Sequence, residues 1–505
     1  LQSGAFLENV KRPHEIFTDR RNSKGFDYAD AENLKNLNSE LEDFSSIKFV
    51  AKSILANDLD LKELPKKMYC PGNNKKTIGT TMFATNEVVA HLQNNMPSNQ
   101  WRDVSLNIKK EIFQKVAEQL HQNQSRLFYL LATEAGKTLK DADAEVREAI
   151  DFVNYYVCEG ERVFLEHKLT GPTGENNYLS HEAKGNFLCI SPWNFPLAIF
   201  VGQITAALVA GNNVIAKPAE DTSIIAYEVI KIFHNAGIPK EALQLVIADK
   251  EVSDELTKLN WLSGIAFTGS SEAAKKINLN LAMSEGPIKT FIAETGGLNA
   301  MFVDSSALKE QVIDDIVRSA FLSAGQRCSA LRVVYVQDDV ADEYWDYLVE
   351  AMQELSQGNP INLDVDIGPI INKSSLEKLV AHSSSLKKKK FRFEELKTNE
   401  LRSGYYFNPI VFEINDIKEI DGEKFGPILH FIRYKQEELD DLIDQVNATG
   451  YGLTMGAHTR ILEKANRIFK KASVGNFYLN RDIVGAVVGV QPFGGHGLSG
   501  TGPKA

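Results

Sequence analysis

The stretch that decides the expected fold is "NFLCISPWNFPLAIFVGQITAALVAGNNVIAKP", residues Asn186 to Pro218. It opens with a short apolar segment, "NFLCIS", and continues into an apolar run from Leu197 to Ala210. Gly211 closes this run, and a second short apolar segment, "NNVIAKP", follows. A helix-length apolar run that ends at a glycine, between two short apolar segments, is typical of a strand–helix–strand unit.

The same alternation continues along the chain. "LQLVIA" and "GIAFTGS" come next, and a second cycle is expected to begin at "FIAETGG" and "NAMFVD" and to continue to "RVVYVQ". This pattern predicts the α/β class, with two domains built on parallel sheets and a cleft between them. Residues 1 to 170 are expected to be mainly helical, because apolar residues recur at helical spacing from Leu106 to Val157. "GPTGENN", residues 171–177, is expected to be a break.

Length and charge narrow the class of protein. A chain of 505 residues exceeds one hydrophobic core, and its net charge of −11 argues against nucleic-acid binding. The one basic run, Lys387 to Lys390, is expected to be a solvated loop. No apolar leader opens the chain, and its most apolar stretch is too short to span a bilayer, so we expect a cytoplasmic protein without a membrane span. Because the chain begins without Met and ends at "GLSGTGPKA", we expect a piece of a longer protein.

The four cysteines are far apart and form no C-x-x-C pair, so neither a metal site nor a disulfide framework is expected. Cys70, Cys158 and Cys189 are expected to be small buried apolar residues. Cys328, in "SAGQRCSALR", follows the polar residues 325–327, whose backbone and positive charge are expected to favour a thiolate.

Two stretches suggest a nucleotide site. "IAFTGSSEAA" predicts a strand, a turn at Gly269 and a helix with Ser270 or Ser271 at its N-cap, which suits a pyrophosphate. The full glycine fingerprint is absent, so an ordinary strand–turn–helix is the alternative. In "VIAKPAED", Lys217 and Glu220 follow a strand, where a carboxylate can accept the ribose hydroxyls of an adenosine and repel a 2′-phosphate. The alternative is a surface Lys and Glu beside a turn.

Three residues fit one reaction. Hydride leaves an aldehyde carbon readily once a thiolate has added to it, and the resulting thioester then needs an activated water. Cys328 supplies the thiol, and the side-chain amide of Asn194 in "SPWNFP" can hold the oxyanion together with the Cys328 backbone N–H. Glu294 in "AETGG" can act as the general base. For each polar residue a structural role is the alternative.

The motifs together resemble a known family. "SPWNFP", "AKPAE", "FTGS", "ETGG", "GQRC", "EKFGP" and "PFGG" occur in the order and spacing of the aldehyde dehydrogenase superfamily, over nearly the whole chain. The resemblance implies NAD as cofactor, with contacts from Trp193, Lys217, Glu220, Gly269, Ser270, Glu423 and Phe425. It implies Cys328 as the nucleophile, Asn194 as the oxyanion donor and Glu294 as the base.

The family also implies an architecture. A helical region and a Rossmann-like NAD-binding domain would occupy residues 1–170 and 188–295, and an α/β catalytic domain residues 296–484. A small β flap that mediates oligomerisation would comprise 171–187 and 485–505, incomplete at its C-terminal end. A homo-oligomer is therefore expected.

A narrower resemblance concerns the substrate. "RRNSKGFDYAD", "AETGGLNAMFVDSSA" and "VGAVVGVQPFGGHGLSGTGPKA" are similar to the dehydrogenase module of the bacterial proline utilization A family. The resemblance implies oxidation of L-glutamate γ-semialdehyde, the open form of Δ1-pyrroline-5-carboxylate, to glutamate in proline catabolism. It also implies a proline dehydrogenase domain in the full-length protein. The residues expected to hold the substrate are Ser329, Gly485 and Ala486 at its carboxylate and Phe195 and Phe493 at its aliphatic part.

Three other interpretations of the function stay open. A dehydrogenase of another semialdehyde, such as succinic semialdehyde, would share the thiol chemistry. A cysteine hydrolase would also use Cys328, although no histidine is clearly paired with it. An inactive scaffold or truncated module would keep only the fold.

Overall fold

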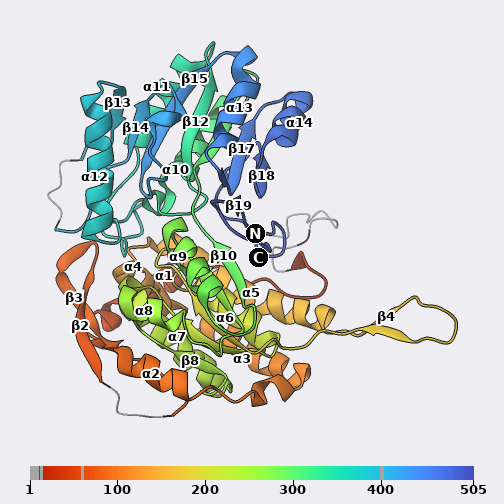
Figure 1. Cartoon of the computed structure of the whole chain (residues 1–505). Coiled ribbons are helices and arrows are strands. Elements are labelled where there is room, and N and C mark those ends of the chain that lie inside the picture. The colour runs from red at the N-terminus through yellow and green to blue at the C-terminus, as the bar shows by residue number, and fades with distance from the viewer. Residues whose placement is uncertain (1–10, 12–14, 58–61, 399–402) are drawn as a thin grey trace, which may run out of the picture.

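The structure, a computed structural model, describes residues 11, 15–57, 62–398 and 403–505. Two sheet-based lobes make up the molecule, as Figure 1 shows: the N-terminal lobe surrounds a five-stranded sheet and the C-terminal lobe a seven-stranded one. Each sheet is covered by helices and has its own hydrophobic core. The predicted α/β class with parallel sheets is confirmed.

The sheet of the N-terminal lobe is fully parallel, in the order β10-β9-β6-β7-β8. Its strands are β6 (Asn186–Ile190), β7 (Asn213–Lys217), β8 (Leu243–Leu245), β9 (Gly264–Thr268) and β10 (Thr290–Glu294). The helices between them are α6 (Ala198–Val209), α7 (Ser223–Ala236), α8 (Lys250–Leu256) and α9 (Ser271–Met283). The strand–helix–strand prediction is thus confirmed. "FIAETGG" does not begin a second cycle, however, because β10 pairs with β9 and closes this first sheet.

The order of these strands locates a crevice. From β6 the chain moves outward through β7 to β8, and then crosses to the other side of β6 to form β9. In open parallel sheets, ligands bind beyond the carboxyl ends of the strands at such a reversal. The residues that follow β6, β7 and β9 are therefore placed to line a binding site.

The sheet of the C-terminal lobe has the order β13-β14-β15-β12-β11-β17-β18, with β13 antiparallel to β14 and the other pairs parallel. Its strands are β11 (Asn299–Val303), β12 (Leu331–Gln337), β13 (Arg392–Glu395), β14 (Ile410–Glu413), β15 (Ile428–Tyr434), β17 (Thr454–His458) and β18 (Asn476–Leu479). Its helices are α10 (Lys309–Phe321), α11 (Ala341–Gln353), α12 (Lys373–Lys388), α13 (Leu439–Ala448) and α14 (Leu462–Lys471).

The basic run at residues 387–390 is not a loop, contrary to the expectation. Lys387 and Lys388 form the last turn of α12, where the helix dipole favours cations. Lys387 pairs with Glu395 at 2.8 Å, so the run is a helix end tied to the neighbouring strand.

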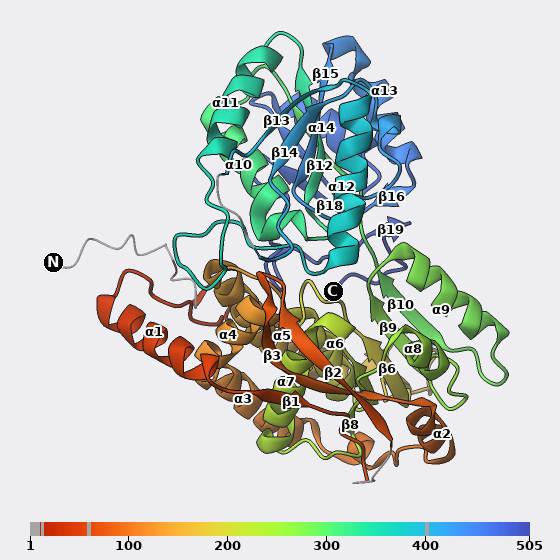
Figure 2. The same cartoon turned by 90° about the vertical axis from the view of Figure 1, so that its left-hand side faces the viewer.

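The N-terminal region is only partly helical. The predicted helices occur as α3 (Leu106–Gln122), α4 (Gln124–Glu134) and α5 (Leu139–Val163), preceded by α1 (Ala31–Ser45) and α2 (Asn86–Asn94). The expectation of mainly helix is wrong for β1 (Phe49–Ala51), β2 (Glu63–Cys70) and β3 (Asn73–Ala84), which form a three-stranded sheet along one side of this lobe (Figure 2). Residues 1–10, 12–14 and 58–61 of this region lie outside the described residues.

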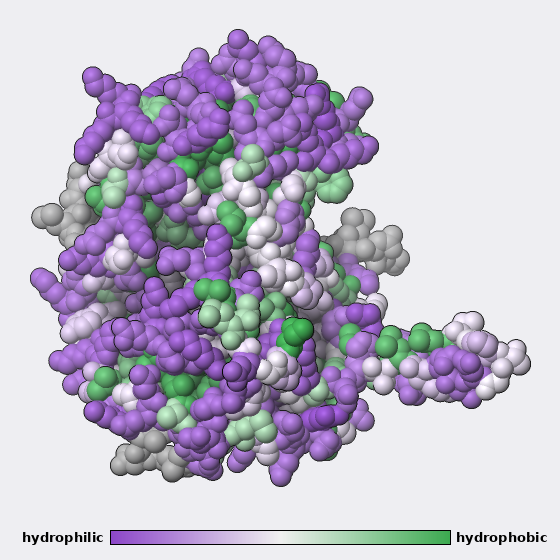
Figure 3. Space-filling model, viewed as in Figure 1, coloured by the Kyte–Doolittle hydropathy of each residue, from purple (hydrophilic) through white to green (hydrophobic). Residues whose placement is uncertain are grey.

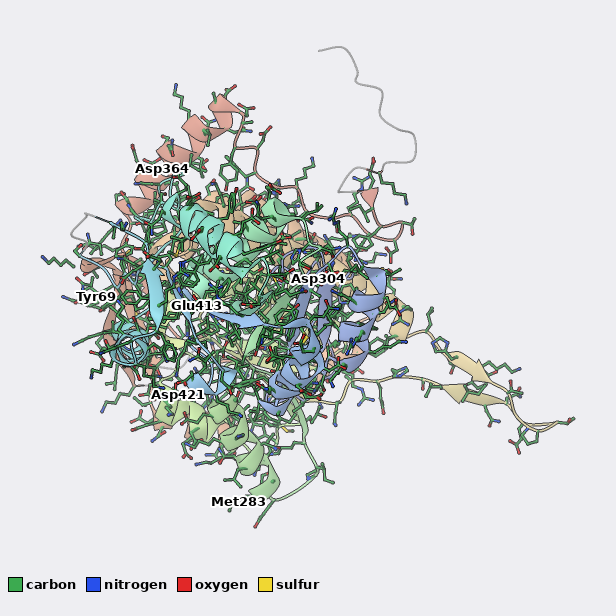
Figure 4. All side chains as sticks on the ribbon, turned by 90° about the horizontal axis from the view of Figure 1, so that it is seen from above. Tyr69, Met283, Asp304, Asp364, Glu413 and Asp421 are labelled. Atoms are coloured by element: carbon green, nitrogen blue, oxygen red, sulfur yellow. The ribbon has the colours of Figure 1, made fainter. Side chains whose placement is uncertain are left out.

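A hairpin of β4 (His167–Leu169) and β5 (Asn177–Leu179) projects from the body of the molecule, and "GPTGENN" forms its tip (Figures 1 and 4). Green apolar atoms are visible along this arm in Figure 3, and Leu165, Leu169, Tyr178 and Leu179 are exposed. Residues 485–505 do not join this hairpin. They lie at the cleft instead, where β19 (His496–Gly497) pairs with β16 (Tyr451–Gly452). The role of the hairpin in oligomerisation stays a prediction.

All four cysteines carry free thiols, and their surroundings differ. Cys70 and Cys189 are buried, as predicted. Cys158 is not the expected core residue, because it is half-buried and its Sγ donates a hydrogen bond to Asp19 at 3.0 Å. No helix within the described ranges is long and apolar enough to cross a membrane.

Candidate active site

A cavity of about 1710 Å³ lies between the lobes, at the carboxyl edge of the five-stranded sheet. All of the residues that the sequence predicts for catalysis, cofactor and substrate line this one cavity. They are Trp193, Asn194, Phe195, Lys217, Glu220, Gly269, Ser270, Glu294, Cys328, Ser329, Glu423, Phe425, Gly485, Ala486 and Phe493. The structure brings them together from both lobes, and their individual roles stay predictions.

A left-handed turn sets the position of Cys328. Between α10 and β12, Ser323, Ala324 and Gly325 have φ values of 53°, 54° and 65°. Consecutive residues in this region are costly for L-amino acids, about 1–3 kcal/mol each. At Gly325 a side chain is also excluded, since a Cβ there would lie 2.3 Å from the carbonyl oxygen of Gly426. The turn is followed by Cys328, which lines the cavity just before β12 begins.

Asn299, which the sequence did not single out, holds the backbone of the cysteine. Its Nδ2 donates to the carbonyl oxygens of Cys328 at 2.7 Å and Ala330 at 2.9 Å, and its Oδ1 accepts the N–H of Thr454 at 3.1 Å. Asn299 is the first residue of a buried, otherwise apolar strand. A polar residue in a strand that is otherwise apolar is the feature of the sequence that could have indicated this role.

Arg327 lowers the pKa of the Cys328 thiol, as expected, but this effect is outweighed and the expected thiolate is not found. The Arg327 guanidinium donates to Asp141 at 3.1 Å and to Ser323 at 3.0 Å. Burial raises the pKa of the Cys328 thiol to about 12, with Glu423 and Glu294 adding to the effect. The thiol is therefore neutral in this structure, and a base must take its proton before it can attack.

Asn194 is held in position for an oxyanion. It follows β6, is 8% exposed, and donates from Nδ2 to the carbonyl oxygen of Gln326 at 3.1 Å. An amide nitrogen carries two hydrogens, so one fixes the side chain and the second is available to the cavity. Such a fixed donor is what stabilises negative charge on a reacting oxygen.

Glu294, the last residue of β10, is a carboxyl that titrates near neutral pH. Burial raises its pKa to about 8, against the opposing effects of the Gly495 N–H and Lys504. A carboxyl with such a pKa can accept a proton from the thiol or from water and release it again near the working pH.

The edge of the five-stranded sheet fits a dinucleotide. Ser270 caps α9, accepting the N–H of Ala273 at 3.2 Å, and the free amides of this helix end border the cavity. Lys217 is 7% exposed, and burial lowers its pKa to about 8. Glu220 lies 3.6 Å from Lys66 of β2, a neighbour that the sequence did not reveal. A buried cation, a helix N-terminus and a carboxylate in one crevice match the phosphate and ribose of such a ligand.

A second group of residues that line the cavity comes from the segment after β6 and the segment before β15. Trp193 and Phe425 pack edge to face with ring centroids 5.5 Å apart. Glu423 lies beside them, 16% exposed, and is paired with Arg332 at 3.3 Å. Arg332 is another residue that the sequence did not indicate, although an arginine inside "LRVVYVQ" is unusual for a buried strand.

The region around Ser329 suits an anionic head group. Ser329 is 5% exposed, and Gly485 has a φ of 71°, a conformation that turns successive amides toward one point. A Cβ at Gly485 would lie 4.0 Å from the Arg327 guanidinium, and Phe195 lies beneath Lys137 at 4.2 Å. Arg327 and Lys137 are each paired with a buried carboxylate, Asp141 at 3.1 Å and Glu145 at 2.7 Å, so the Ser329 hydroxyl and the amides at Gly485 are the donors expected to hold a carboxylate.

Comparison with known proteins agrees with this geometry. The model of the aldehyde dehydrogenase family matches residues 62–505. Bifunctional protein PutA of Salmonella typhimurium is 43% identical over 519 aligned residues, which cover 100% of this chain and 38% of that protein. The chain thus spans well under half the length of such relatives.

Shorter relatives match from end to end. The 1-pyrroline-5-carboxylate dehydrogenase of Staphylococcus aureus is 31% identical, with 96% of this chain and 95% of that protein covered. A structure of a mutant of Thermus thermophilus 1-pyrroline-5-carboxylate dehydrogenase superimposes with a TM-score of 0.90 at 28% identity, covering 96% of this chain and 95% of that one.

Proposed function

Because the chain belongs to the aldehyde dehydrogenase family, we propose that it oxidises L-glutamate γ-semialdehyde to L-glutamate with NAD as the hydride acceptor. The observation that carries the proposal is the single cavity that combines Cys328, Asn194 and Glu294 with Ser329, Gly485 and Ala486. The relatives named for 1-pyrroline-5-carboxylate, the cyclic form of this semialdehyde, support the choice of substrate.

The reaction begins with proton loss from the Cys328 thiol, for which Glu294 is the nearby base. The thiolate adds to the aldehyde carbon, and the carbonyl oxygen becomes an oxyanion that the Asn194 amide stabilises. The bound nicotinamide supplies an acceptor for the hydride that leaves this carbon. A thioester between Cys328 and the γ-carboxyl of glutamate then remains.

Hydrolysis completes the turnover. Glu294 takes a proton from a water molecule, the resulting hydroxide attacks the thioester, and the thiolate leaves as glutamate is released. One aldehyde and one water give one carboxylate, and the hydride and two protons are passed on. The same carboxyl thus serves as base in both halves of the reaction.

The remaining predicted residues of the cavity would bind the head group and the methylene groups of the substrate. Its carboxylate would bind to the Ser329 hydroxyl and the amides of Gly485 and Ala486, near Arg327. Its methylene groups would lie between Phe195 and Phe493. A plain aldehyde has no partner for these polar groups, so the site selects an amino-acid semialdehyde.

The cofactor is a further part of the proposal. Members of the family are generally NAD(P)-dependent. The preference for NAD over NADP rests on Glu220, at the position expected for the adenosine ribose. Trp193, Gly269 and Ser270 would contact the pyrophosphate side, and Glu423 and Phe425 the nicotinamide ribose.

The larger assembly is proposed from the relatives. The match to 38% of PutA supports the proposal that this chain corresponds to one part of a longer bifunctional protein, in which a proline dehydrogenase domain would supply the substrate. The exposed apolar residues of the β4–β5 hairpin support a homo-oligomer. A cytoplasmic location stays a prediction.

A panel of aldehydes tests the function. At matched concentrations, NADH formation should be fastest with Δ1-pyrroline-5-carboxylate and slower with succinic semialdehyde and propionaldehyde. Cys328→Ala should abolish it, whereas Cys158→Ala, a control at a thiol outside the cavity, should not. A higher rate with succinic semialdehyde would favour the alternative substrate, and NADH formation by Cys328→Ala would exclude the thiol mechanism.

A further inference from the structure

The stretch "RRNSKGFDYAD", residues 20–30, takes no part in the proposed chemistry, yet helix α5 holds it at two points. The N–H and the hydroxyl of Ser23 donate to Asp151 at 2.6 and 3.1 Å, and the N–H of Phe26 donates to Asp143 at 3.1 Å. Hydrogen bonds to carboxylates are stronger than those between neutral groups, so these contacts fix the stretch against α5.

Helix α5 also contributes to the wall of the cavity. Glu148, Phe152 and Tyr156, each four positions apart, line it. Asp151 and Tyr155 each precede one of these residues by one position, so they lie on the neighbouring face of the helix. One helix thus carries both a wall of the cavity and the stretch that begins at Arg20.

The side chain of Arg20 is packed rather than solvated. It is 9% exposed, and its guanidinium carbon lies 3.6 Å from the ring centroid of Phe17 and 5.2 Å from that of Tyr155. An ion pair does not account for this burial, because Asp19 lies 3.9 Å away and is 53% exposed. The position of the guanidinium therefore depends on what lies on its other side.

That neighbour is the loop of residues 485–491, here called the head-group loop. Nη2 of Arg20 donates to the carbonyl oxygen of Val488 at 3.3 Å. Gly489 has a φ of 73°, and a Cβ there would overlap the Arg20 guanidinium and lie 3.2 Å from the Tyr155 ring. A glycine at this position lets the backbone of the loop lie directly against the guanidinium.

The other bonds of the head-group loop are internal. The N–H of Val487 donates to Gln491 Oε1 at 2.8 Å, and the N–H groups of Val490 and Gln491 donate to the carbonyl oxygen of Val487 at 3.0 and 3.1 Å. These bonds close a turn but do not tie it to another segment, whereas the bond from Arg20 does. Amides that are already fixed bind a ligand more tightly, because the loop need not be ordered on binding.

We propose that Arg20 is a positioning residue that holds the head-group loop so that the amides of Gly485 and Ala486 meet the carboxylate of the substrate. The inference rests on the proposed substrate and on the proposed role of these two amides. Arg20 itself does not line the cavity. It therefore adds a determinant of substrate specificity that lies behind the binding site.

Hydrogen exchange tests the positioning without any substrate. In Arg20→Met, which keeps an apolar contact but removes the donors, the amides of the head-group loop should exchange about fivefold or more faster than in the wild type. The amides of β12 lie outside this contact and should exchange equally in both proteins. Unchanged exchange in the loop, or an equal increase in β12, would overturn the proposal.

Steady-state kinetics test the consequence for specificity. The KM for Δ1-pyrroline-5-carboxylate should rise about fivefold or more in Arg20→Met, while kcat stays within about twofold of the wild type. With propionaldehyde, which has no carboxylate, both constants should stay within about twofold. A general loss of stability would act on both aldehydes alike, so an equal rise of KM for both would contradict the proposal.

Arg21→Met is the matched control. Arg21 is the next residue and is exposed, so its substitution should change neither the exchange of the loop nor the two KM values.

Gly489→Ala tests the same contact from the loop, because it places a methyl group where the guanidinium lies. It should raise the KM for Δ1-pyrroline-5-carboxylate more in the wild type than in Arg20→Met, whose flexible side chain can move aside. If Arg20→Met fails to fold, Gly489→Ala alone decides. An unchanged KM for this substrate, or an equal rise with propionaldehyde, would overturn the proposal.

The two kinds of measurement separate this inference from the proposed function. A wild-type protein that does not oxidise Δ1-pyrroline-5-carboxylate, with faster exchange of the loop in Arg20→Met, would remove the substrate and leave the positioning intact. Turnover by the wild type without that difference in exchange would do the reverse.

Discussion

The guanidinium of Arg327, next to the nucleophile in sequence, is bonded to Asp141 at 3.1 Å and so belongs to the interface between α5 and the cysteine loop. Both side chains are almost fully buried, at 8% and 3% exposure. The pair fixes the loop beside Ser329, while burial keeps Cys328 itself a neutral thiol.

Removing Asp141 should therefore destabilise the protein. Asp141→Ala leaves a buried guanidinium without its carboxylate, which typically costs about 3–5 kcal/mol. Urea unfolding should show a loss of this size, and the double variant Asp141→Ala/Arg327→Met should recover part of it. Equal stability of Asp141→Ala and the wild type would show that the pair contributes nothing.

The pH dependence of turnover should follow Glu294. Because burial raises the pKa of this carboxyl to about 8, it is mostly protonated at pH 7, and its base form grows as the pH rises through that value. The steady-state rate should increase over the same range. Glu294→Gln should lose both most of the rate and this rise, as measured by NADH formation between about pH 6 and 9. A profile in Glu294→Gln that matches the wild type would assign the base to another group.

Ser329 should matter only for the charged substrate. A hydrogen bond to a charged group contributes about 1.5–3 kcal/mol, so Ser329→Ala should lower kcat/KM for the glutamate semialdehyde by about 10-fold to 100-fold. With propionaldehyde, which has no carboxylate, kcat/KM should stay within about twofold of the wild type. Equal losses for both aldehydes would mean that Ser329 supports the nucleophile rather than the head group.

Cofactor preference should depend on two residues that the structure places 3.6 Å apart, Glu220 and Lys66. Glu220→Ala removes the carboxylate that repels a 2′-phosphate and leaves the ammonium of Lys66 to attract one. The ratio of kcat/KM for NAD over NADP should fall about 10-fold or more. Adding Lys66→Ala should reverse part of the gain with NADP. No change in the ratio for Glu220→Ala would place the ribose elsewhere.

The sheet-and-helix core could be predicted from the sequence because each of its strands and helices is marked by a local pattern of residues. The strand at Asn186–Ile190, the helix that follows and the stop at Gly211 each show in a short window of residues. The strands Glu63–Cys70 and Asn73–Ala84 were missed because their lysines, asparagines and threonines interrupt any apolar run, although the second half of Asn73–Ala84 is largely buried.

The residues that line the cavity could be predicted one by one from the sequence, but the hydrogen bonds and ion pairs that join them to other residues could not. Motifs identified the residues that face the cavity, since each follows a strand end or precedes a strand. The contacts of Arg332 with Glu423 and Gly426 bridge more than 90 positions and carry no local pattern. The thiol pKa depends mainly on burial between the two lobes, which outweighs the opposing effect of Arg327 next to Cys328 and is not visible in the sequence.

The most direct test of the account is to trap the covalent intermediate. In Glu294→Gln the thiol proton can still leave slowly to solvent, whereas the water that attacks the thioester has lost its base, so hydrolysis should slow more than hydride transfer. This variant, mixed with NAD and Δ1-pyrroline-5-carboxylate and quenched in acid, should form NADH in a burst close to one equivalent and then slow. Mass spectrometry should find one glutamyl group on the peptide that contains Cys328. A burst without this adduct, or an adduct on another residue, would contradict the proposed path through a Cys328 thioester.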